Sequence, residues 1–370
     1  MSADPSAQVG ADPVNGRASR SLDVSHQSFK QRLIIPAAAL ACLVLAFASL
    51  FIGPTGISVV AIPAAVSALV WGDQSATALQ AKLVLVDLRL PRTLLAAFVG
   101  AALALSGAMM QGMFRNPLAD PGLIGVSAGA TLAAIATIAL GDSLLFYWSA
   151  LLGPYALSAS AFLGGFVAVL MLMFVAGRGG QIMTSTLLLA GIAFSALALA
   201  LAGLIAYGSD DRELRDLTLW QMGSLTGSSW EKFLAAVPFA LVIFLSIPLL
   251  TRALNGLLLG EAAAFHLGIN VPRAKLAIVL ITAASVGAAV AAAGMIGFVG
   301  IVVPHVVRLM VGPDHRVLLP ASALLGAALV LFADILARMV VAPSELPIGI
   351  IMAIIGAPVF LHLVLSRGRG

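Results

Sequence analysis

Ten long apolar runs constrain the fold of this chain more than any other feature of its sequence. Most of them reach the roughly 17 to 25 residues that an α-helix needs to cross the hydrocarbon core of a bilayer. The runs cover residues 33–52, 93–114, 123–140, 155–176, 184–207, 233–250, 275–293, 296–311, 317–341 and 348–365. Backbone groups in that core must be hydrogen-bonded within the protein, and a helix achieves this within one segment. The sequence therefore predicts an all-α, polytopic membrane protein with about ten transmembrane helices.

The composition supports a membrane protein and argues against a soluble or nucleic-acid-binding protein. Apolar residues make up 61% of the chain and charged residues 10%, whereas soluble domains contain about 25% charged residues. The net charge of +4 does not indicate a nucleic-acid partner, because the basic residues lie in short loops and form no basic patch. We expect membrane lipid, and no nucleic acid, around this protein.

The N-terminal segment differs from the rest of the chain. The first 32 residues are polar and lack the apolar core and small-residue cleavage site of a secretory signal. We expect residues 1–32 to be a disordered cytoplasmic tail and residues 33–370 to form one transmembrane domain. A further apolar run at 57–71 is short and interrupted by Pro63, so we interpret it as an interfacial segment.

The distribution of charge indicates the orientation of the spans. With the N-terminus inside, most of the 20 Lys and Arg residues lie in cytoplasmic segments, as the positive-inside rule requires. The largest outside loop is rich in acidic residues, namely Asp210, Asp211, Glu213, Asp216 and Glu231. We therefore expect both termini to be cytoplasmic.

The chain lacks the sequence of an ATPase. A phosphate-binding loop requires G-x-x-x-x-G-K-[ST], in which backbone N–H groups surround the phosphates and the lysine reaches the terminal ones. No lysine here follows a glycine; the lysines are Lys30, Lys82, Lys232 and Lys275. We therefore expect no catalytic residues, and any energy from ATP must come from a partner.

Histidine and methionine could bind a metal or haem iron, but their pattern does not favour this. The five histidines show no H-E-x-x-H sequence and no paired ligand spacing. His305 follows Pro304, so it could bind haem iron or satisfy a carbonyl freed by the proline, and we favour the structural role. Met109, Met110 and Met113 could offer thioether ligands, although helix packing explains them better. We expect no metal site and no bound cofactor.

A polar connector between the second and third spans carries a family resemblance. Residues 111–125 read Q-G-M-F-R-N-P-L-A-D-P-G-L-I-G, and their two prolines prevent one helix from continuing. This connector, R-L-P-R at 89–92, E-L-P-I-G at 345–349 and G-A-P-V-F at 356–360 resemble the permeases of ABC importers for ferric siderophores, haem and cobalamin. The resemblance extends from about residue 85 to the C-terminus.

The resemblance implies a fold, partners and a cargo. It implies the type II ABC importer permease fold and a homodimer in the bacterial inner membrane, with a path lined by spans five and ten. The implied partners are two copies of an ATPase subunit, which binds ATP and Mg²⁺, and a periplasmic substrate-binding protein. Residues 216–225 and 312–316 look most like the haem-importing branch. We therefore rank haem import into the cytoplasm first, ferric siderophores second and cobalamin third.

The loop after the sixth span is the expected ATPase contact. Its glycines bracket one or two helical turns with an apolar side, which could seat in a groove on another protein. In the resembling family this segment forms the coupling helices that dock on the ATP-binding subunit, and an ordinary amphipathic interfacial helix is the alternative. The expected coupling residues are Gly260, Glu261, Ala262, Phe265, Leu267 and Gly268.

Three arginines at the outer face of the membrane are the expected docking site for the binding protein. Arg89 and Arg92 open the second span, and Arg338 closes the ninth. Arginines at a membrane boundary can simply extend to the headgroups. In the related cobalamin importer, however, arginines that match Arg92 and Arg338 meet glutamates on the two lobes of the binding protein. We therefore expect these three arginines to dock an acidic, two-lobed partner.

Thr184 and Ser185 begin the fifth span. A Thr or Ser at a helix start is most often an N-cap. The family resemblance instead implies that these residues narrow the cytoplasmic end of the path as a gate. Both interpretations stay open at this point.

A secondary transporter driven by an ion gradient is the alternative from a different class. Such a protein should carry ionisable residues at mid-membrane depth. The ten runs contain few of them. We therefore favour an ATP-driven importer.

Overall fold

The computed structural model describes residues 13–54, 58–177 and 183–367, and these residues include many helices and no β-strand. Each expected span corresponds to one helix, so the all-α prediction is confirmed. These ten helices are α1 (Pro13–Phe51), α4 (Leu90–Phe114), α5 (Val126–Leu140), α7 (Ala156–Ala176), α8 (Thr184–Tyr207), α10 (Trp230–Leu258), α12 (Val271–Ala293), α13 (Val299–Val311), α14 (His315–Met339) and α15 (Ile348–Arg367).

Seven helical stretches in the described residues are long and apolar enough to cross a membrane. Among the shorter apolar helices are α5, with 15 residues, and α13, with 13 residues. The short α13 begins only after a non-helical segment, in which Gly294 and Phe298 both have a positive φ. Non-helical backbone is tolerated at membrane depth where it is buried in protein. The neighbouring backbone fits this rule, because the Ser224 N–H donates to the Ala293 carbonyl at 2.8 Å.

Shorter elements lie between these helices. α3, η2 and α4 form one continuous helical stretch from Ala76 to Phe114, longer than the span expected at 93–114. The run that we interpreted as interfacial forms η1 and α2, which pack on α3 and η2 through Ala65, Ala81 and Leu85. The shorter elements are η1 (Val59–Ala61), α2 (Ile62–Val70), α3 (Ala76–Lys82), η2 (Leu83–Arg89), η3 (Pro121–Ile124), α6 (Phe146–Leu152), η4 (Gly153–Tyr155), α9 (Asp211–Gln221) and α11 (Glu261–His266).

The first helix begins earlier than the sequence predicts. We expected residues 1–32 to be a disordered tail, but α1 already starts at Pro13. Residues 13–32 are therefore helical, continuous with the first span, and the prediction of disorder is wrong for them. Residues 1–12 lie outside the described part of the chain. The division into a tail and a permease domain stays a prediction.

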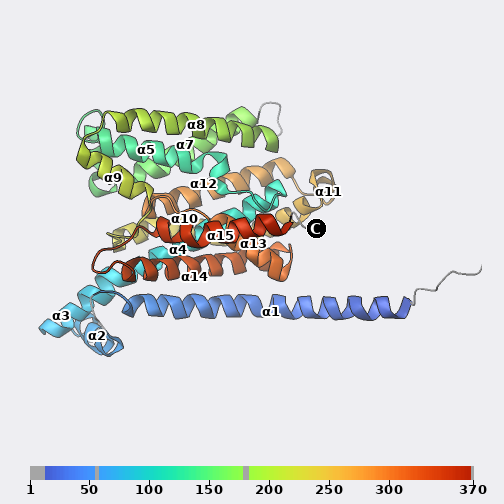
Figure 1. Cartoon of the computed structure of the whole chain (residues 1–370), viewed down its shortest axis with the longest axis horizontal. Helices are drawn as coiled ribbons and strands as arrows, with labels where there is room; N and C mark the ends of the chain where they lie inside the picture. The colour runs from blue at the N-terminus through green and yellow to red at the C-terminus, as the bar shows by residue number, and fades with distance from the viewer. Residues whose placement is uncertain (1–12, 55–57, 178–182, 368–370) are drawn as a thin grey trace, which may run out of the picture.

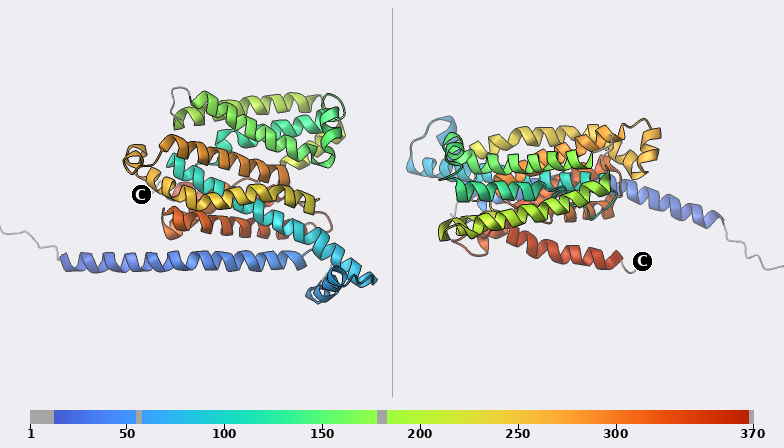
Figure 2. Two further views of the ribbon diagram at one scale, coloured as in Figure 1. Left: turned by 180° about the vertical axis from the view of Figure 1, so that it is seen from behind. Right: turned by 90° about the horizontal axis from the view of Figure 1, so that it is seen from above.

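The helix α4 lies at the centre of the bundle (Figures 1 and 2), and it packs against α10, α12, α13 and α14. Close packing there depends on glycine. A Cβ added to Gly107 would collide with the backbone of Gly300 in α13, and one added to Gly100 would collide with Gly326 in α14. Small residues allow helix backbones to approach closely where lipid supplies no hydrophobic drive between helices.

Near the C-terminal end of α4, a side chain supplies a hydrogen bond that a proline in α13 removes. Pro304 has no N–H, so the Gly300 carbonyl four residues earlier loses its helical donor. The buried Gln111 side chain donates to the carbonyls of Gly300 and Ile301, at 3.3 and 3.2 Å. We had considered His305 for this role. Gln111 performs it for these two carbonyls, and its position in the polar connector does not reveal this contact.

The elements of interest lie at opposite ends of the bundle. Figure 1 shows α2, α3 and α9 at one end and α11 with the C-terminal end of α15 at the other. The start of α8 lies at the same end as α11. The expected docking residues and the expected coupling residues are therefore separated by the length of the helices.

Candidate functional site

Arg92 is the centre of an ion-pair cluster near the end that carries α3. Its guanidinium contacts Asp334 of α14 at 2.8 Å and Glu345, in the loop before α15, at 2.9 Å. Arg338 contacts the same Asp334 at 3.0 Å. Asp334 is fully buried, whereas the Glu345 side chain is 26% exposed. Buried charges need such partners, because transfer of an unpaired charge out of water is very costly.

Two of the three arginines also hold the end of α1. Arg338 donates to the carbonyls of Ser49 and Ile52, each at 3.1 Å, and Arg89 donates to the carbonyl of Leu50 at 2.6 Å. The last carbonyls of a helix lack intrahelical donors and carry partial negative charge, so guanidinium groups stabilise them. Arg89, at the end of η2, and Arg338, in α14, therefore fasten the end of α1 and are not free rim residues.

The structure brings the three expected docking residues together around one hollow. A cavity of about 260 Å³ is lined by Arg89, Arg92, Arg338 and Glu345, together with apolar residues and the 225–228 loop. Three arginine side chains and one carboxylate, that of Glu345, are the charged groups among the residues that line it. The cavity therefore suits a carboxylate from outside.

Glu345 already occupies the place that such a carboxylate would take. Its two oxygens accept from Arg92 Nη1 at 2.9 and 3.0 Å, and Oε2 also accepts from Thr226 at 2.8 Å. Partial burial would raise the pKa of Glu345, but the hydrogen bonds and charge of Arg92 outweigh it, so the pKa lies below its usual value. Glu345 is thus ionised at neutral pH and competes for Arg92.

The expected coupling segment forms a short, exposed helix at the opposite end. Gly260 and Gly268, both at positive φ, bracket α11. Ala264 is buried against the bundle, whereas Phe265 and Leu267 are 70% and 52% exposed. Ala262 is also exposed. The apolar side that the sequence predicts therefore points away from the subunit, as a docking surface for a partner requires.

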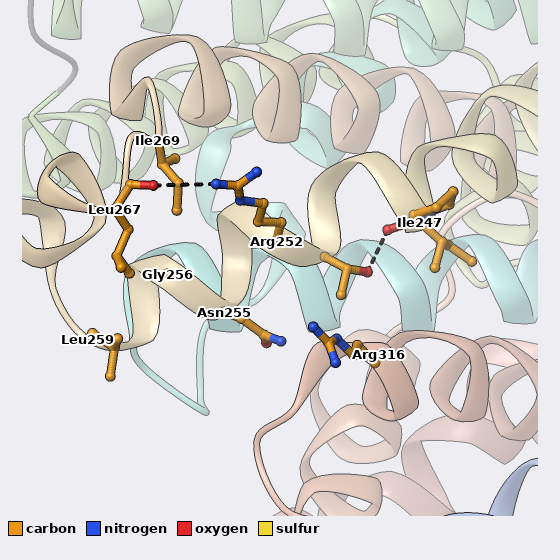
Figure 3. A pocket seen from close by; sticks show the side chains of 10 residues that line it. Ile247, Arg252, Asn255, Gly256, Leu259, Leu267, Ile269 and Arg316 are labelled. Carbon is orange, nitrogen blue, oxygen red and sulfur yellow. Dashed lines mark hydrogen bonds between the residues drawn. The ribbon is translucent and has the colours of Figure 1, made fainter.

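A groove runs beside this helix. It has a volume of about 650 Å³ and lies between α10, the segment after α11 and the start of α14. In Figure 3, Leu267 and Ile269 lie on one side of Arg252, and Arg316 approaches from α14. Arg252 donates to the Leu267 carbonyl at 3.5 Å. The groove thus combines apolar walls with two cationic side chains.

Thr184 and Ser185 do not cap their helix. The N-cap of α8 is Met183, and no side chain caps it. Thr184 Oγ1 instead accepts a hydrogen bond from Lys275 Nζ at 3.4 Å, and Ser185 is exposed. The capping interpretation is therefore wrong, whereas the gate interpretation stays a prediction. The preceding residues 178–182 lie outside the described part.

Several residues at these sites escaped the sequence analysis. Asp334 precedes Arg338 by four residues, a helical ion-pair spacing that could have indicated it. Glu345 stands in the E-L-P-I-G segment that we used only for family resemblance. Lys275 could have been noticed as the cation that opens the apolar run 275–293. Among the described residues, no group of three or more His, Cys, Asp or Glu side chains could hold a metal ion.

The bundle defines the chain as the permease of an ABC importer. It aligns with a metal-chelate type ABC transporter in an inward-facing conformation at a TM-score of 0.76 and 34% identity, covering 90% of this chain and 99% of that one. The sequence profile of the FecCD transport family matches residues 41–366. The chain therefore belongs to the FecCD transport family, whose importers work with ATPase and substrate-binding partners.

Individual relatives differ in the cargo that their names state. The chain is 48% identical over 281 residues to the hemin transport system permease protein HmuU of Yersinia pestis, covering 76% of this chain and 83% of that protein. It is 45% identical over 286 residues to the vitamin B12 import system permease protein BtuC of Shigella sonnei, covering 76% and 84%. It is 43% identical over 287 residues to the cobalamin permease BtuC of Halobacterium salinarum, covering 78% and 74%.

Proposed function

We propose that this chain is the permease subunit of an ATP-driven importer that moves haem from the periplasm to the cytoplasm. The choice of haem as the cargo rests on the 48% identity of the chain to a hemin permease, against 45% and 43% to two cobalamin permeases. Haem is transported without chemical change, so the chain needs no catalytic residue and no cofactor of its own.

The working assembly contains two copies of the chain in the bacterial inner membrane, with both termini in the cytoplasm. We infer a homodimer interface with a central path at α8 and α15 from the family resemblance, and both helices expose large apolar side chains that a second subunit or lipid can cover. Those exposed by 57% or more include Leu189, Ile192, Leu197, Leu199, Leu204, Ile354 and Leu361. A single subunit would leave these side chains without a protein partner in the part that the structure describes. Thr184 and Ser185 form the gate at the cytoplasmic end of this path.

Two partners act at the two ends of the bundle. An ATPase subunit, which carries ATP and Mg²⁺, receives the exposed Phe265 and Leu267 of α11 in a groove on its surface. A periplasmic binding protein presents carboxylates to the cavity around Arg89, Arg92 and Arg338. Closure of the ATPase on ATP then displaces α11 and alternates the side to which the path opens.

Cobalamin is the second candidate cargo, because the identities to the cobalamin permeases are only slightly lower. Ferric siderophores, the third candidate, are supported by the family resemblance alone. A preference for any of them must arise from the binding protein and the path together, so only the complete importer can show it.

The experiment compares the three cargoes directly. The permease is reconstituted in liposomes with its ATPase and its cognate binding protein, and ATP-dependent uptake of haem, a ferric siderophore and cobalamin is measured. We expect haem uptake to exceed the others by at least about tenfold, which corresponds to about 1.4 kcal/mol of discrimination. Uptake of cobalamin or a siderophore without haem uptake would overturn the cargo and leave the family assignment intact.

A further inference from the structure

Lys275 lies where the coupling segment meets the start of α8. It is the fifth residue of α12, and its side chain is 4% exposed. Its Nζ donates to Oε1 of Glu261, the first residue of α11, at 2.7 Å. The same nitrogen donates to Oγ1 of Thr184, the first residue of α8, at 3.4 Å. One ammonium group therefore contacts both the expected coupling segment and the expected gate.

The two contacts differ in strength. The bond to Glu261 is short and joins opposite charges, and such charge-assisted bonds are roughly twice as strong as neutral ones. The bond to Thr184 is long and has a neutral acceptor, so it is weaker. A buried ammonium keeps its acceptors because no water replaces them. When Glu261 and Thr184 move apart, Lys275 is expected to follow Glu261 and to release Thr184.

The surrounding elements allow such a separation. α11 is held by α10 and α12, with Ala264 as its buried residue, while its apolar side is exposed for a partner. α8 packs mainly on α5 and α7. A force on Phe265 and Leu267 would therefore act first on Glu261, and it would reach α8 through Lys275 and through α12, which packs on α7.

We propose that Lys275 relays the position of α11 to Thr184, so that movement of the coupling segment changes the hydrogen bonding at the cytoplasmic gate. Lys275 is a positioning residue in this account, because it touches neither ATP nor cargo. The proposal rests on the ATP-driven cycle of the proposed function, and it adds the side chain through which the two sites are joined.

The test measures coupling and not transport alone. The complete importer in liposomes is assayed for cargo transported per ATP hydrolysed, using whichever cargo the wild type takes up. Lys275→Met keeps the length of the side chain and removes its charge, and Thr184→Val removes only the acceptor. We expect each to lower cargo per ATP by about tenfold, within the usual range of coupling between sites. Lys275→Arg, which keeps the charge and donors, should retain most of the coupling.

A matched control and a double variant separate a relay from a merely structural ion pair. Arg273→Met removes an exposed cation from the same helix, two residues away, and should leave cargo per ATP unchanged. If Lys275 acts through Thr184, the double variant should be no worse than either single variant, because contacting residues are not additive.

Three results would overturn the relay. One is an unchanged ratio in Thr184→Val. Another is multiplicative loss in the double variant. The third is an equal loss of ATP hydrolysis and uptake in Lys275→Met, because this would show only a damaged fold. A wild-type complex without ATP-driven uptake would instead refute the proposed function itself, and the relay with it.

Discussion

Replacing Asp334 with asparagine is expected to destabilise the permease by about 3–5 kcal/mol, because it leaves the buried Arg338 and the largely buried Arg92 without their shared carboxylate. Arg92 and Arg338 both contact Asp334, at 2.8 and 3.0 Å. Thermal unfolding of the full chain in detergent, followed with the yield of folded protein, measures this effect.

Glu345→Gln is the matched control, because it also removes a carboxylate from Arg92. Glu345 is partly exposed, so its ion pair should contribute no more than about 1 kcal/mol. Equal losses of stability in the two variants would show that the buried carboxylate of Asp334 contributes no more than the partly exposed one of Glu345. An effect below about 1 kcal/mol for Asp334→Asn would contradict the central place that we give this residue.

The same control variant has a second, opposite consequence for docking. If a carboxylate of the binding protein must displace Glu345 from Arg92, Glu345→Gln should tighten association by about fivefold, or about 1 kcal/mol. Weakened association would mean that Glu345 assists the partner instead. Charge reversal at Arg92 is a poorer test, because a third carboxylate beside Asp334 and Glu345 would damage the fold as well.

Leu267→Asp is expected to uncouple the permease from its ATPase while leaving it folded. Leu267 is half exposed, so the fold loses little, but a charge in an apolar docking groove should cost about 2 kcal/mol or more of association. Affinity for the ATPase should then fall by about 30-fold. The measurements are membrane yield, ATPase binding and ATP-driven uptake.

Glu261→Pro is a less specific variant for the same purpose. Glu261 is the first residue of α11, where proline is tolerated, so this substitution mainly removes the carboxylate that pairs with Lys275 at 2.7 Å. Loss of uptake in that variant alone would therefore not identify the ATPase contact. Full uptake in Leu267→Asp would place the contact elsewhere on the cytoplasmic face.

The number and order of the spanning helices follow from the sequence because hydrophobic length is a local property. A lipid core requires long apolar helices, and that requirement can be read from one segment at a time. The short α11 was predictable for a similar reason, since Gly260 and Gly268 mark its two ends. The helical state of residues 13–32 was not predicted, because their polar composition gives no apolar signal.

The pairing of charges could not be read from the sequence in the same way. Arg92 meets residues more than 240 positions away, and Lys275 meets Thr184 from 91 positions away. The sequence therefore identified the arginines but assigned them only to an external partner. Their internal carboxylates, and the link between Glu261 and Thr184, depend on how the helices pack.

The energy source of transport distinguishes an ATP-driven importer from a secondary transporter. Liposomes containing the permease, its ATPase and its binding protein are loaded with ATP and Mg²⁺ or with a non-hydrolysable analogue, and haem uptake is followed. We expect uptake with ATP, none with the analogue and none from the permease alone under a proton or sodium gradient. Gradient-driven uptake by the permease alone would contradict it.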